Sequence, residues 1–461
     1  MQSGISMLKE DERRLIVRIA LPSMLANVSA SVCVLLDALL LSRSGTQASA
    51  AVSVGFPALT LIQTVGFTLG TGAGSFVSRS LGGGRTREAL LISSTAFFLA
   101  LFFSLALGAA GFAFSPALAR MLGAADDLAA PSALYMRFVF CAAPLLCMNL
   151  TLSSILRALG RTKANMIAFG VGAAVGAALQ ALLIARLDFG ISGSGAAMLA
   201  REGVTLVLLF YLLYRHDRRF RPRPGLFAPT RSVLADIMRS GLPTLLRQGL
   251  MSVSAALLSR VSAAFGEAAL AGMGLTVRAV SLVSSAVIGF GQGFQPVCGF
   301  AYGAGDYARI RRAYRFSMAC VCFSLLALGA AVFCFAAPLL SLFSSAPDVA
   351  AFTQKALRVQ SIVFFAQGAV IMMNMLTQSA GFTLRASVIA TSRQGFVFIP
   401  LLLLLPRFLG ETGLLIAQSL SDLLSLFLCY LLSRRCLGDA SRVTRFSCGR
   451  CGCSDARTAS Q

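Results

Sequence analysis

The sequence is short of charge and of the side chains that catalysis usually needs. Charged residues make up 13% of the 461 residues, against roughly 25% in an average soluble domain. There is no Trp, and the single His, His216, cannot by itself form a metalloenzyme centre or a His-based catalytic site. A G-x-x-x-x-G-K-[ST] phosphate loop and a G-x-S-x-G elbow are also absent. These absences argue against nucleotide-driven pumping and against an enzyme, and we expect no metal site and no cofactor.

Long apolar runs take up most of the chain instead. Hydrophobic residues make up 57% of the sequence, and the mean hydropathy is +0.78. A helix needs roughly 20 consecutive apolar residues to cross a bilayer, and about twelve windows satisfy that requirement. The expected spans are residues 15–42, 51–78, 89–114, 132–156, 165–186, 193–214, 241–263, 269–297, 315–343, 356–379, 386–406 and 412–433. The sequence therefore predicts an all-α polytopic membrane protein with about twelve transmembrane helices.

Glycine and proline positions recur along the chain at a constant offset, the one that separates Pro22 from Pro243. The other matched positions are Gly45 and Gly266, Gly70-Thr71-Gly72 and Gly291-Gln292-Gly293, and Gly160 and Gly381. Because Gly and Pro set backbone geometry, the repeat copies a fold rather than a site. Six crossings return a chain to the side on which it started, so the halves are predicted to be a parallel repeat about an axis normal to the membrane.

This repeat predicts two lobes of six helices each. We expect an N-terminal lobe at residues 1–214, a cytoplasmic linker at 215–240, a C-terminal lobe at 241–435 and a cytoplasmic tail at 436–461. The tail holds a C-x-x-C-x-C cluster formed by Cys448, Cys451 and Cys453. Three thiolates can hold a metal or respond to oxidants, but a fourth ligand is not evident, and the alternative is an unstructured tail.

The formal net charge of +22 comes mainly from arginines on one side of the expected membrane. With the N-terminus inside, the inward loops contain Arg79, Arg157, Arg309 and most other basic residues, whereas the outward loops are richer in acids. This asymmetry follows the positive-inside rule and predicts a multi-pass protein of the inner or plasma membrane with both termini in the cytoplasm. No basic stripe with interleaved aromatics is present, so we expect no nucleic-acid partner. The expected partners are the lipid bilayer and small amphipathic molecules, and we expect a monomer.

Ionisable side chains inside apolar spans are rare and costly, so each is a candidate functional residue. Asp37 is the leading candidate, because it lies six residues before Arg43. At about 1.5 Å per residue, that places it about 9 Å from the outer surface. Gln180, Arg201 and Glu202 are expected at similar depth in the fifth and sixth spans. We interpret these four residues as an ion-coupling site, the alternative being a structural salt bridge.

A second group of polar residues is spread over the other spans. The candidates for lining a substrate path are Asn27, Gln63, Gln248, Gln292, Gln295, Asn374, Arg393, Gln394, Gln418 and Asp422. Polar side chains in a membrane bundle either line a passage or tie helices together, and the sequence leaves both interpretations open. Arg393 and Asp422 could form an ion pair.

Five stretches of the sequence carry a further signal: Pro22 through Gly45, Gly291-Gln292-Gly293-Phe294-Gln295-Pro296, Tyr302-Gly303-Ala304-Gly305, Ser392-Arg393-Gln394 through Pro400, and Leu405-Pro406-Arg407-Phe408 with Gly413. Together these stretches resemble the multidrug and toxic compound extrusion (MATE) family, and its drug-exporting bacterial branch in particular. The similarity covers roughly residues 10–435. It implies a two-lobe, twelve-helix antiporter that exports organic cations or amphipathic compounds by alternating access, driven by inward proton or sodium flow.

The resemblance also implies a coupling site in the first lobe, from which this sequence departs. In many members an acid on helix 1 acts with Asn and Asp on helix 5 and Thr on helix 6. Here the acid is Asp37, but the helix-5 positions are Gly176 and Gln180 and the helix-6 position is Arg201. A guanidinium at that position would take the space and charge that a cation needs, which leaves room for coupling through another acid and for anionic or zwitterionic substrates. A lipid-linked oligosaccharide flippase of the same superfamily, or a non-transporting member, stays an alternative.

Overall fold

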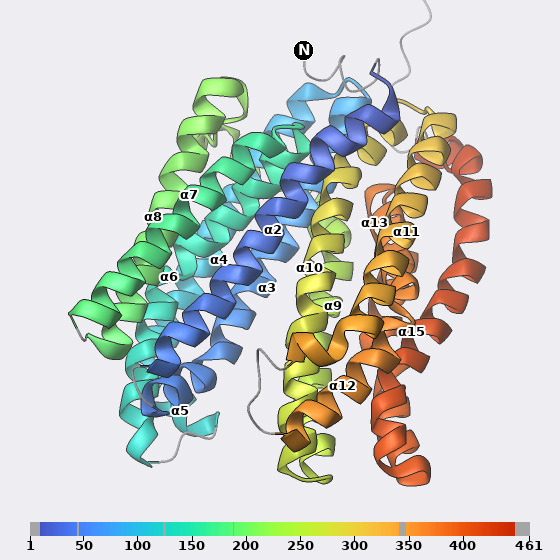
Figure 1. Cartoon of the computed structure of the whole chain (residues 1–461). Helices are drawn as coiled ribbons and strands as arrows, with labels where there is room; N and C mark the ends of the chain where they lie inside the picture. Colours follow the sequence, from blue (N-terminus) through green and yellow to red (C-terminus); the bar gives the residue numbers. More distant parts are fainter. Residues whose placement is uncertain (1–9, 44–45, 123–125, 188, 341–346, 448–461) are drawn as a thin grey trace, which may run out of the picture.

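The computed structural model describes residues 10–43, 46–122, 126–187, 189–340 and 347–447. In this part of the chain the regular structure is helical throughout, and the helices form two groups (Figure 1). The first group is α2 (Glu12–Arg43), α3 (Thr46–Gly82), α4 (Thr86–Ala113), the short α5 (Ser115–Met121), α6 (Asp126–Ala158), α7 (Thr162–Gln180) with the π-helical turn η1 (Ala181–Arg186), and α8 (Gly190–His216). Two short turns, η2 (Arg218–Phe220) and η3 (Pro224–Leu226), lead to the second group. That group is α9 (Arg231–Ala263), α10 (Glu267–Gly303), α11 (Tyr307–Leu340), α12 (Pro347–Ser361), α13 (Phe364–Ser379), α14 (Thr383–Thr391), the π-helical turn η4 (Ser392–Phe396), and α15 (Phe398–Ser447).

Within the described residues, each predicted span lies on a helix or on a pair of consecutive helices. Among the described residues, nine helices are long and apolar enough to cross a membrane, and a tenth span is the pair α12 and α13, which meet at 55°. One further predicted span is α9, whose Arg247 and Arg260 lower its hydropathy. The last is the second half of α15, which is broken at Gly410, where the backbone leaves the helical conformation. The prediction of an all-α polytopic membrane fold is confirmed.

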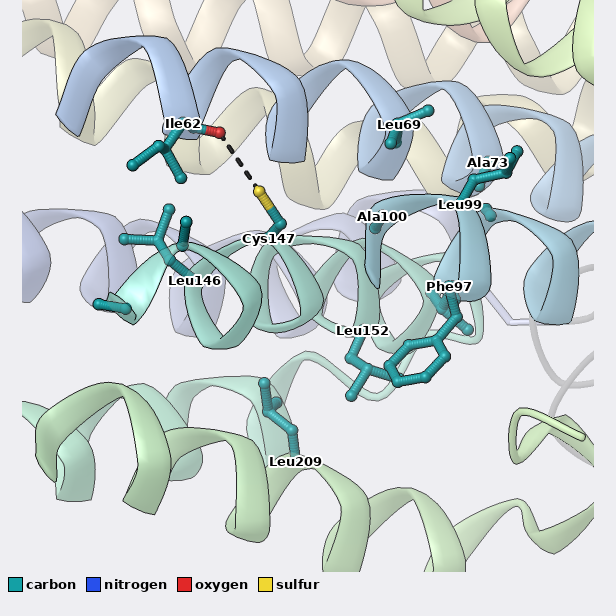
Figure 2. Packing of buried hydrophobic residues seen from close by; sticks show 14 of the residues in the cluster. Ile62, Leu69, Ala73, Phe97, Leu99, Ala100, Leu146, Cys147, Leu152 and Leu209 are labelled. Carbon is teal, nitrogen blue, oxygen red and sulfur yellow. Dashed lines mark hydrogen bonds between the residues drawn. The ribbon is translucent and has the colours of Figure 1, made fainter. Parts of the chain in front are cut away.

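The first lobe has a continuous buried core that α3, α4, α6 and α8 share (Figure 2). Ile62 of α3, Phe97 of α4, Leu152 of α6 and Leu209 of α8 are among its members. The Cys147 thiol donates to the Ile62 carbonyl oxygen at 3.4 Å, which joins α6 to α3. Helices in a bilayer are held by van der Waals contact rather than by burial from water, so the closeness of such packing determines how the lobe holds together.

The segments beside the second lobe are more helical than the sequence predicted. α9 begins at Arg231, inside the expected linker at 215–240, because the Thr230 side chain accepts the Val233 backbone N–H and so caps the helix. α15 continues to Ser447, beyond the expected lobe boundary at residue 435. The prediction for Cys448, Cys451 and Cys453 concerns residues outside the described part of the chain.

The first helix of each lobe packs against the opposite lobe. The N-terminal part of α2 places Ile16 and Ile19 in one buried cluster with Phe294 of α10. α9 packs in the same way against α3, where Thr71 Oγ1 and Thr244 Oγ1 lie 3.0 Å apart. Figure 1 shows the two groups of helices close together near the start of α2 and diverging toward the other end. Two equivalent helix pairs therefore join the lobes at one end of the molecule.

Glycine allows the close approach at both of these junctions. A Cβ at Gly293 would lie 2.8 Å from the Ala20 backbone nitrogen and still closer to the Ala20 Cα. A Cβ at Gly72 would meet the Ile237 carbonyl oxygen at a distance that real Cβ atoms do not show. Gly72 and Gly293 occupy equivalent positions in the repeat. The repeated glycines of the sequence thus mark the interface between the lobes.

Candidate functional site

In the first lobe, the Glu202 carboxylate is the centre of a buried polar cluster. Glu202 lies on α8 and is 8% exposed. Its Oε1 accepts Arg201 Nη2 at 3.0 Å, and its Oε2 accepts Asn149 Nδ2 at 2.8 Å. The same Asn149 nitrogen donates to the Glu202 carbonyl oxygen at 2.9 Å, which ties α6 to α8. Both carboxylate oxygens of Glu202 therefore already have donors.

Gly176, one of the two helix-5 positions, packs against the Arg201 side chain. A Cβ at Gly176 of α7 would lie 3.0 Å from the Arg201 Cβ and Cδ, so the stem of Arg201 fills the space that the glycine leaves. Gln180 lies on the same helix and is 4% exposed. Asp37 lies in α2, but its side chain is outside the described part of the structure. Its meeting with Gln180 and Arg201 stays a prediction.

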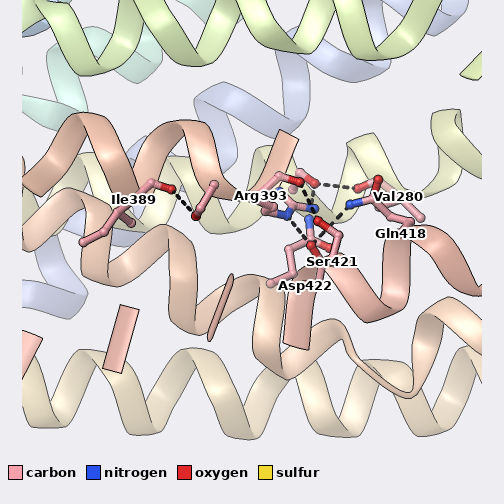
Figure 3. A network of polar contacts seen from close by, with 9 residues as sticks. Val280, Ile389, Arg393, Gln418, Ser421 and Asp422 are labelled. Carbon is pink, nitrogen blue, oxygen red and sulfur yellow. Dashed lines mark hydrogen bonds and ion pairs between the residues drawn. The ribbon is translucent and has the colours of Figure 1, made fainter. Parts of the chain in front are cut away.

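The second lobe contains a buried ion pair between Arg393 and Asp422 (Figure 3). Arg393 Nε donates to Asp422 Oδ1 at 2.7 Å, and Gln418 Nε2 donates to the same oxygen at 3.3 Å. Ser421 Oγ donates to the Arg393 carbonyl oxygen at 3.0 Å, which fixes the turn η4 against α15. Asp422 is 1% exposed, and no donor among the described residues contacts its Oδ2. One oxygen of this buried carboxylate is thus available to a proton or a cation.

The two buried carboxylates occupy equivalent positions in the two lobes. Gly190 and Gly410, with φ of 50° and 58°, each stand where the last helix of a lobe begins. Glu202 follows Gly190 by the same number of positions as Asp422 follows Gly410. The offset between the two acids is shorter by a single position than the offset in the rest of the repeat. Aligning the two halves at the constant offset of the repeat therefore does not place Glu202 opposite Asp422.

A third polar cluster lies where the lobes meet. Asn27 Nδ2 of α2 donates to Gln292 Oε1 of α10 at 3.0 Å, which joins the two lobes directly. Beside it, Gln295 Nε2 donates to Gln378 Oε1 at 3.0 Å, and Gln378 Nε2 donates to Thr244 Oγ1 at 2.9 Å. Asn27, Gln292 and Gln295 were candidates for lining a path or for tying helices together, and in this conformation they form hydrogen bonds between helices. Separation of the lobes at this end would break the bond between Asn27 and Gln292.

The other candidate path residues lie on separate elements, and one of them, Asn374, joins two helices. Asn374 Nδ2 donates to the Ala386 carbonyl oxygen at 2.8 Å, so it fastens α13 to α14. Gln63 of α3, Gln248 of α9 and Gln394 of η4 are partly buried. Of the two interpretations that the sequence left open, Asn374 has the contact expected of a helix tie.

Some of the buried polar residues were not predicted from the sequence. Asn149 is the donor that contacts Glu202, which lies 53 residues further along the chain. Arg157 was assigned to an inward loop, but it lies in the last turn of α6 and is 8% exposed. Arg309 is corrected in the same way, since it is 5% exposed and its Nη2 donates to the Glu10 carbonyl oxygen at 2.6 Å. The positions of charged residues are visible in the sequence, but only the orientation of each helix shows which side chains are buried inside the protein.

A comparison with family models decides the family. The model named MatE matches residues 22–182 and 243–404, two segments whose starts, Pro22 and Pro243, are the paired prolines of the internal repeat. The chain belongs to the MatE family. MATE proteins are membrane transporters and not enzymes. The family membership therefore confirms the expected resemblance to MATE proteins and the expectation that the chain is not an enzyme.

Individual relatives and solved structures agree with this membership. Multidrug export protein MepA of Staphylococcus aureus (strain MSSA476) is 23% identical over 399 residues, covering 85% of this chain and 88% of MepA. A MATE structure in complex with MaL6 is 23% identical, covers 95% of this chain and 99% of its own, and has a TM-score of 0.91. An outward-facing multidrug resistance MATE family transporter has 24% identity over 95% and 99% of the two chains, with a TM-score of 0.88. A MOP superfamily transporter from Pyrococcus furiosus, described as having a binding pocket of reverse polarity, has 22% identity over 95% and 98%, with a TM-score of 0.89. These similarities establish the MATE fold.

Proposed function

We propose that this MATE protein is an antiporter that exports organic cations or other amphipathic compounds, driven by inward flow of protons or sodium ions. The similarity to MepA, a protein named for multidrug export, supports export of drug-like compounds. The two lobes meet at one end and diverge at the other, an arrangement that supports alternating access. In this mechanism the lobes rotate relative to each other, so that the closed end opens and the open end closes. The substrate bound between them is thereby exposed to the other side of the membrane.

Asp422 is our candidate for the residue that couples ion flow to export. It is buried, and Arg393 and Gln418 both act on its Oδ1, whereas no donor in the described part of the chain reaches its Oδ2. An unsatisfied oxygen on a buried carboxylate costs free energy that binding of a proton or cation would recover. This unsatisfied oxygen is the observation that carries the proposal. Glu202 already has donors on both oxygens, so we expect it to contribute less to coupling.

We also propose that the end at which the lobes meet faces the cytoplasm. The pairing of Arg309 and Arg312 with Glu12 places a basic cluster at the start of α2. Basic residues concentrate on the cytoplasmic side of membrane proteins, so both termini of the chain would lie in the cytoplasm of a plasma or inner membrane. One chain supplies both lobes, which supports action as a monomer.

Asp422→Asn is expected to reduce gradient-driven ethidium efflux by at least about tenfold in proteoliposomes, because the amide cannot take up a proton or bind a cation as a carboxylate does. Exchange of ethidium without an imposed gradient should persist, since asparagine keeps the size and shape of the aspartate side chain. Efflux would be followed under a proton gradient and then under a sodium gradient, and the gradient that supports it identifies the coupling ion.

The matched control is Glu267→Gln, which removes an exposed carboxylate at the start of α10. It should leave efflux unchanged, and Glu202→Gln should reduce efflux by less than Asp422→Asn. Efflux at the wild-type rate in Asp422→Asn would move coupling to Asp37 or Glu202. Absence of flux from the wild-type protein under both gradients would contradict the antiporter proposal itself.

A further inference from the structure

A small pocket lies at the junction of three helices that belong to both lobes. Its walls are formed by residues of α3, α6 and α10, among them Thr71, Ser75, Ser78, Arg157, Gln292 and Gln295. Its volume is about 20 Å³, room for little more than a water molecule in this conformation. Hydroxyl groups, side-chain amides and one charged group, the Arg157 guanidinium, line the pocket together with apolar surface. No carboxylate lines it in the part of the chain that the structure describes.

The Arg157 charge is buried and has no ion-pair partner among the described residues. Arg157 is 8% exposed, and its Nη2 donates to Ser154 Oγ at 2.7 Å while its Nη1 donates to Ser153 Oγ. Both serines lie on α6 itself, so these bonds do not tie Arg157 to another helix. Arg201 and Arg393 differ from Arg157, because each contacts a carboxylate. A buried guanidinium without a counterion is costly unless an anion reaches it.

The internal repeat provides a neutral counterpart of Arg157. Arg157 and Gln378 are separated by the offset of the repeat, and each precedes by three positions a glycine of positive φ, Gly160 at 75° and Gly381 at 81°. The Gln378 amide is satisfied by neutral partners, including Thr244 and Gln295. A neutral amide thus serves the packing needs of this position in the second lobe. The positive charge at Arg157 is not required by the fold of the repeat, which points to a ligand.

We propose that Arg157 marks a binding site for an anionic group, a sulfonate, carboxylate or phosphate, carried by an amphipathic molecule. The guanidinium would hold the anion through charge-assisted hydrogen bonds, and the hydroxyl group of Ser75 would donate to one of its remaining oxygens. Because α3 and α6 form one side of the pocket and α10 the other, separation of the lobes at this end enlarges it. The pocket therefore admits the anionic group when it faces the side on which α2 begins and contracts when the lobes close. The role of this site in a transport cycle rests on the proposed function, whereas binding of the anion to Arg157 does not.

Isothermal titration of the full chain in nanodiscs of phosphatidylcholine, which carries no net charge, tests the assignment. The probes are naphthalene-2-sulfonate and the cation 2-naphthyltrimethylammonium, which share one ring system, with empty nanodiscs as the blank. Arg157→Gln introduces glutamine, the residue that occupies the equivalent position, Gln378, in the second lobe. It is expected to weaken sulfonate binding by about tenfold or more and to change cation binding by less than about threefold. Arg157→Lys keeps the charge and should retain most of the affinity.

Controls separate this charge from the general positive field of the protein. Arg87→Gln removes an exposed charge on α4 and should leave sulfonate binding unchanged. Unfolding temperatures of the Arg157 variants establish that each is folded before titration. If phosphatidylglycerol in the nanodiscs competes with the sulfonate in the wild type and not in Arg157→Gln, a lipid headgroup is the source of the anion. Without that competition, the source is a free amphipathic anion.

Equal sulfonate affinity in the wild type and Arg157→Gln would overturn the proposal, as would the absence of sulfonate binding by the wild type. Neither result depends on an ion gradient. A failed ethidium antiport assay with Arg157-dependent sulfonate binding would instead contradict only the proposed function.

Discussion

Replacement of Arg393 by alanine is expected to destabilise the protein by about 3–5 kcal/mol, the cost typical of removing one partner from a buried ion pair. The Arg393 side chain is 12% exposed and that of Asp422 is 1% exposed, so neither charge has water to replace its partner. Without Arg393, Asp422 Oδ1 keeps only the longer contact from Gln418, and Oδ2 has no donor among the described residues. The turn η4 would lose its side-chain contact with Asp422, whereas the bond from Ser421 Oγ to the backbone carbonyl oxygen at position 393 would remain.

The measurement is the apparent unfolding temperature of the purified protein, read with a thiol-reactive dye. The chain has no Trp, but Cys147, Cys298 and Cys429 are buried and become reactive on unfolding. Arg407→Ala, which removes an exposed arginine of α15, is the control and should leave the temperature unchanged.

The double variant Arg393→Leu/Asp422→Leu gives the sharper test. Replacing both charges of a buried pair by apolar groups is often nearly neutral, so most of the lost stability should return. An Arg393→Ala variant that unfolds at the wild-type temperature, or a double variant no more stable than the single one, would contradict the expected cost of leaving Asp422 unpaired.

The fold was largely predictable because its signals are local. An apolar run long enough to cross the bilayer is visible in the sequence, and a glycine or proline required by backbone geometry recurs at a fixed offset, as Pro22 and Pro243 do. The start of α9 could not be predicted from apolar runs, because the segment there is polar and yet helical. The helix of α9 begins at Arg231 because of a cap at Thr230, not because of apolar periodicity.

The polar clusters were predicted less completely because each depends on helix orientation. The sequence suggested the contact between Arg393 and Asp422, which are 29 residues apart. It gave no sign that Asn149 contacts Glu202, because many helix orientations satisfy an apolar pattern and few place these two side chains together. Arg157 shows the limit most clearly, since a positive charge at the end of a span is typical of a loop as well as of a buried site.

Gly293→Ala is expected to slow ethidium efflux about tenfold or more. The added methyl group would meet the backbone of Ala20 at distances that atoms do not adopt, and the backbone of a packed helix cannot move aside as a side chain can. Overpacking of this kind costs about 1–3 kcal/mol, and about 1.4 kcal/mol corresponds to a factor of ten in rate or population. The cost falls only on the conformation in which α2 and α10 touch, so the cycle is slowed where the lobes must close.

Gly274→Ala is the matched control on the same helix, because a Cβ at Gly274 meets no atom within 4 Å. It should transport at the wild-type rate and unfold at the same temperature or slightly above, since alanine favours the helix by about 1 kcal/mol. If Gly293→Ala transports as well as Gly274→Ala, closure of this junction is not a step of the cycle. If Gly72→Ala, the equivalent change at the junction of α3 and α9, slows efflux by a similar factor, both junctions must close for turnover. The two equivalent glycines would then be needed for a movement that involves both lobes, and not only for the packing of each lobe.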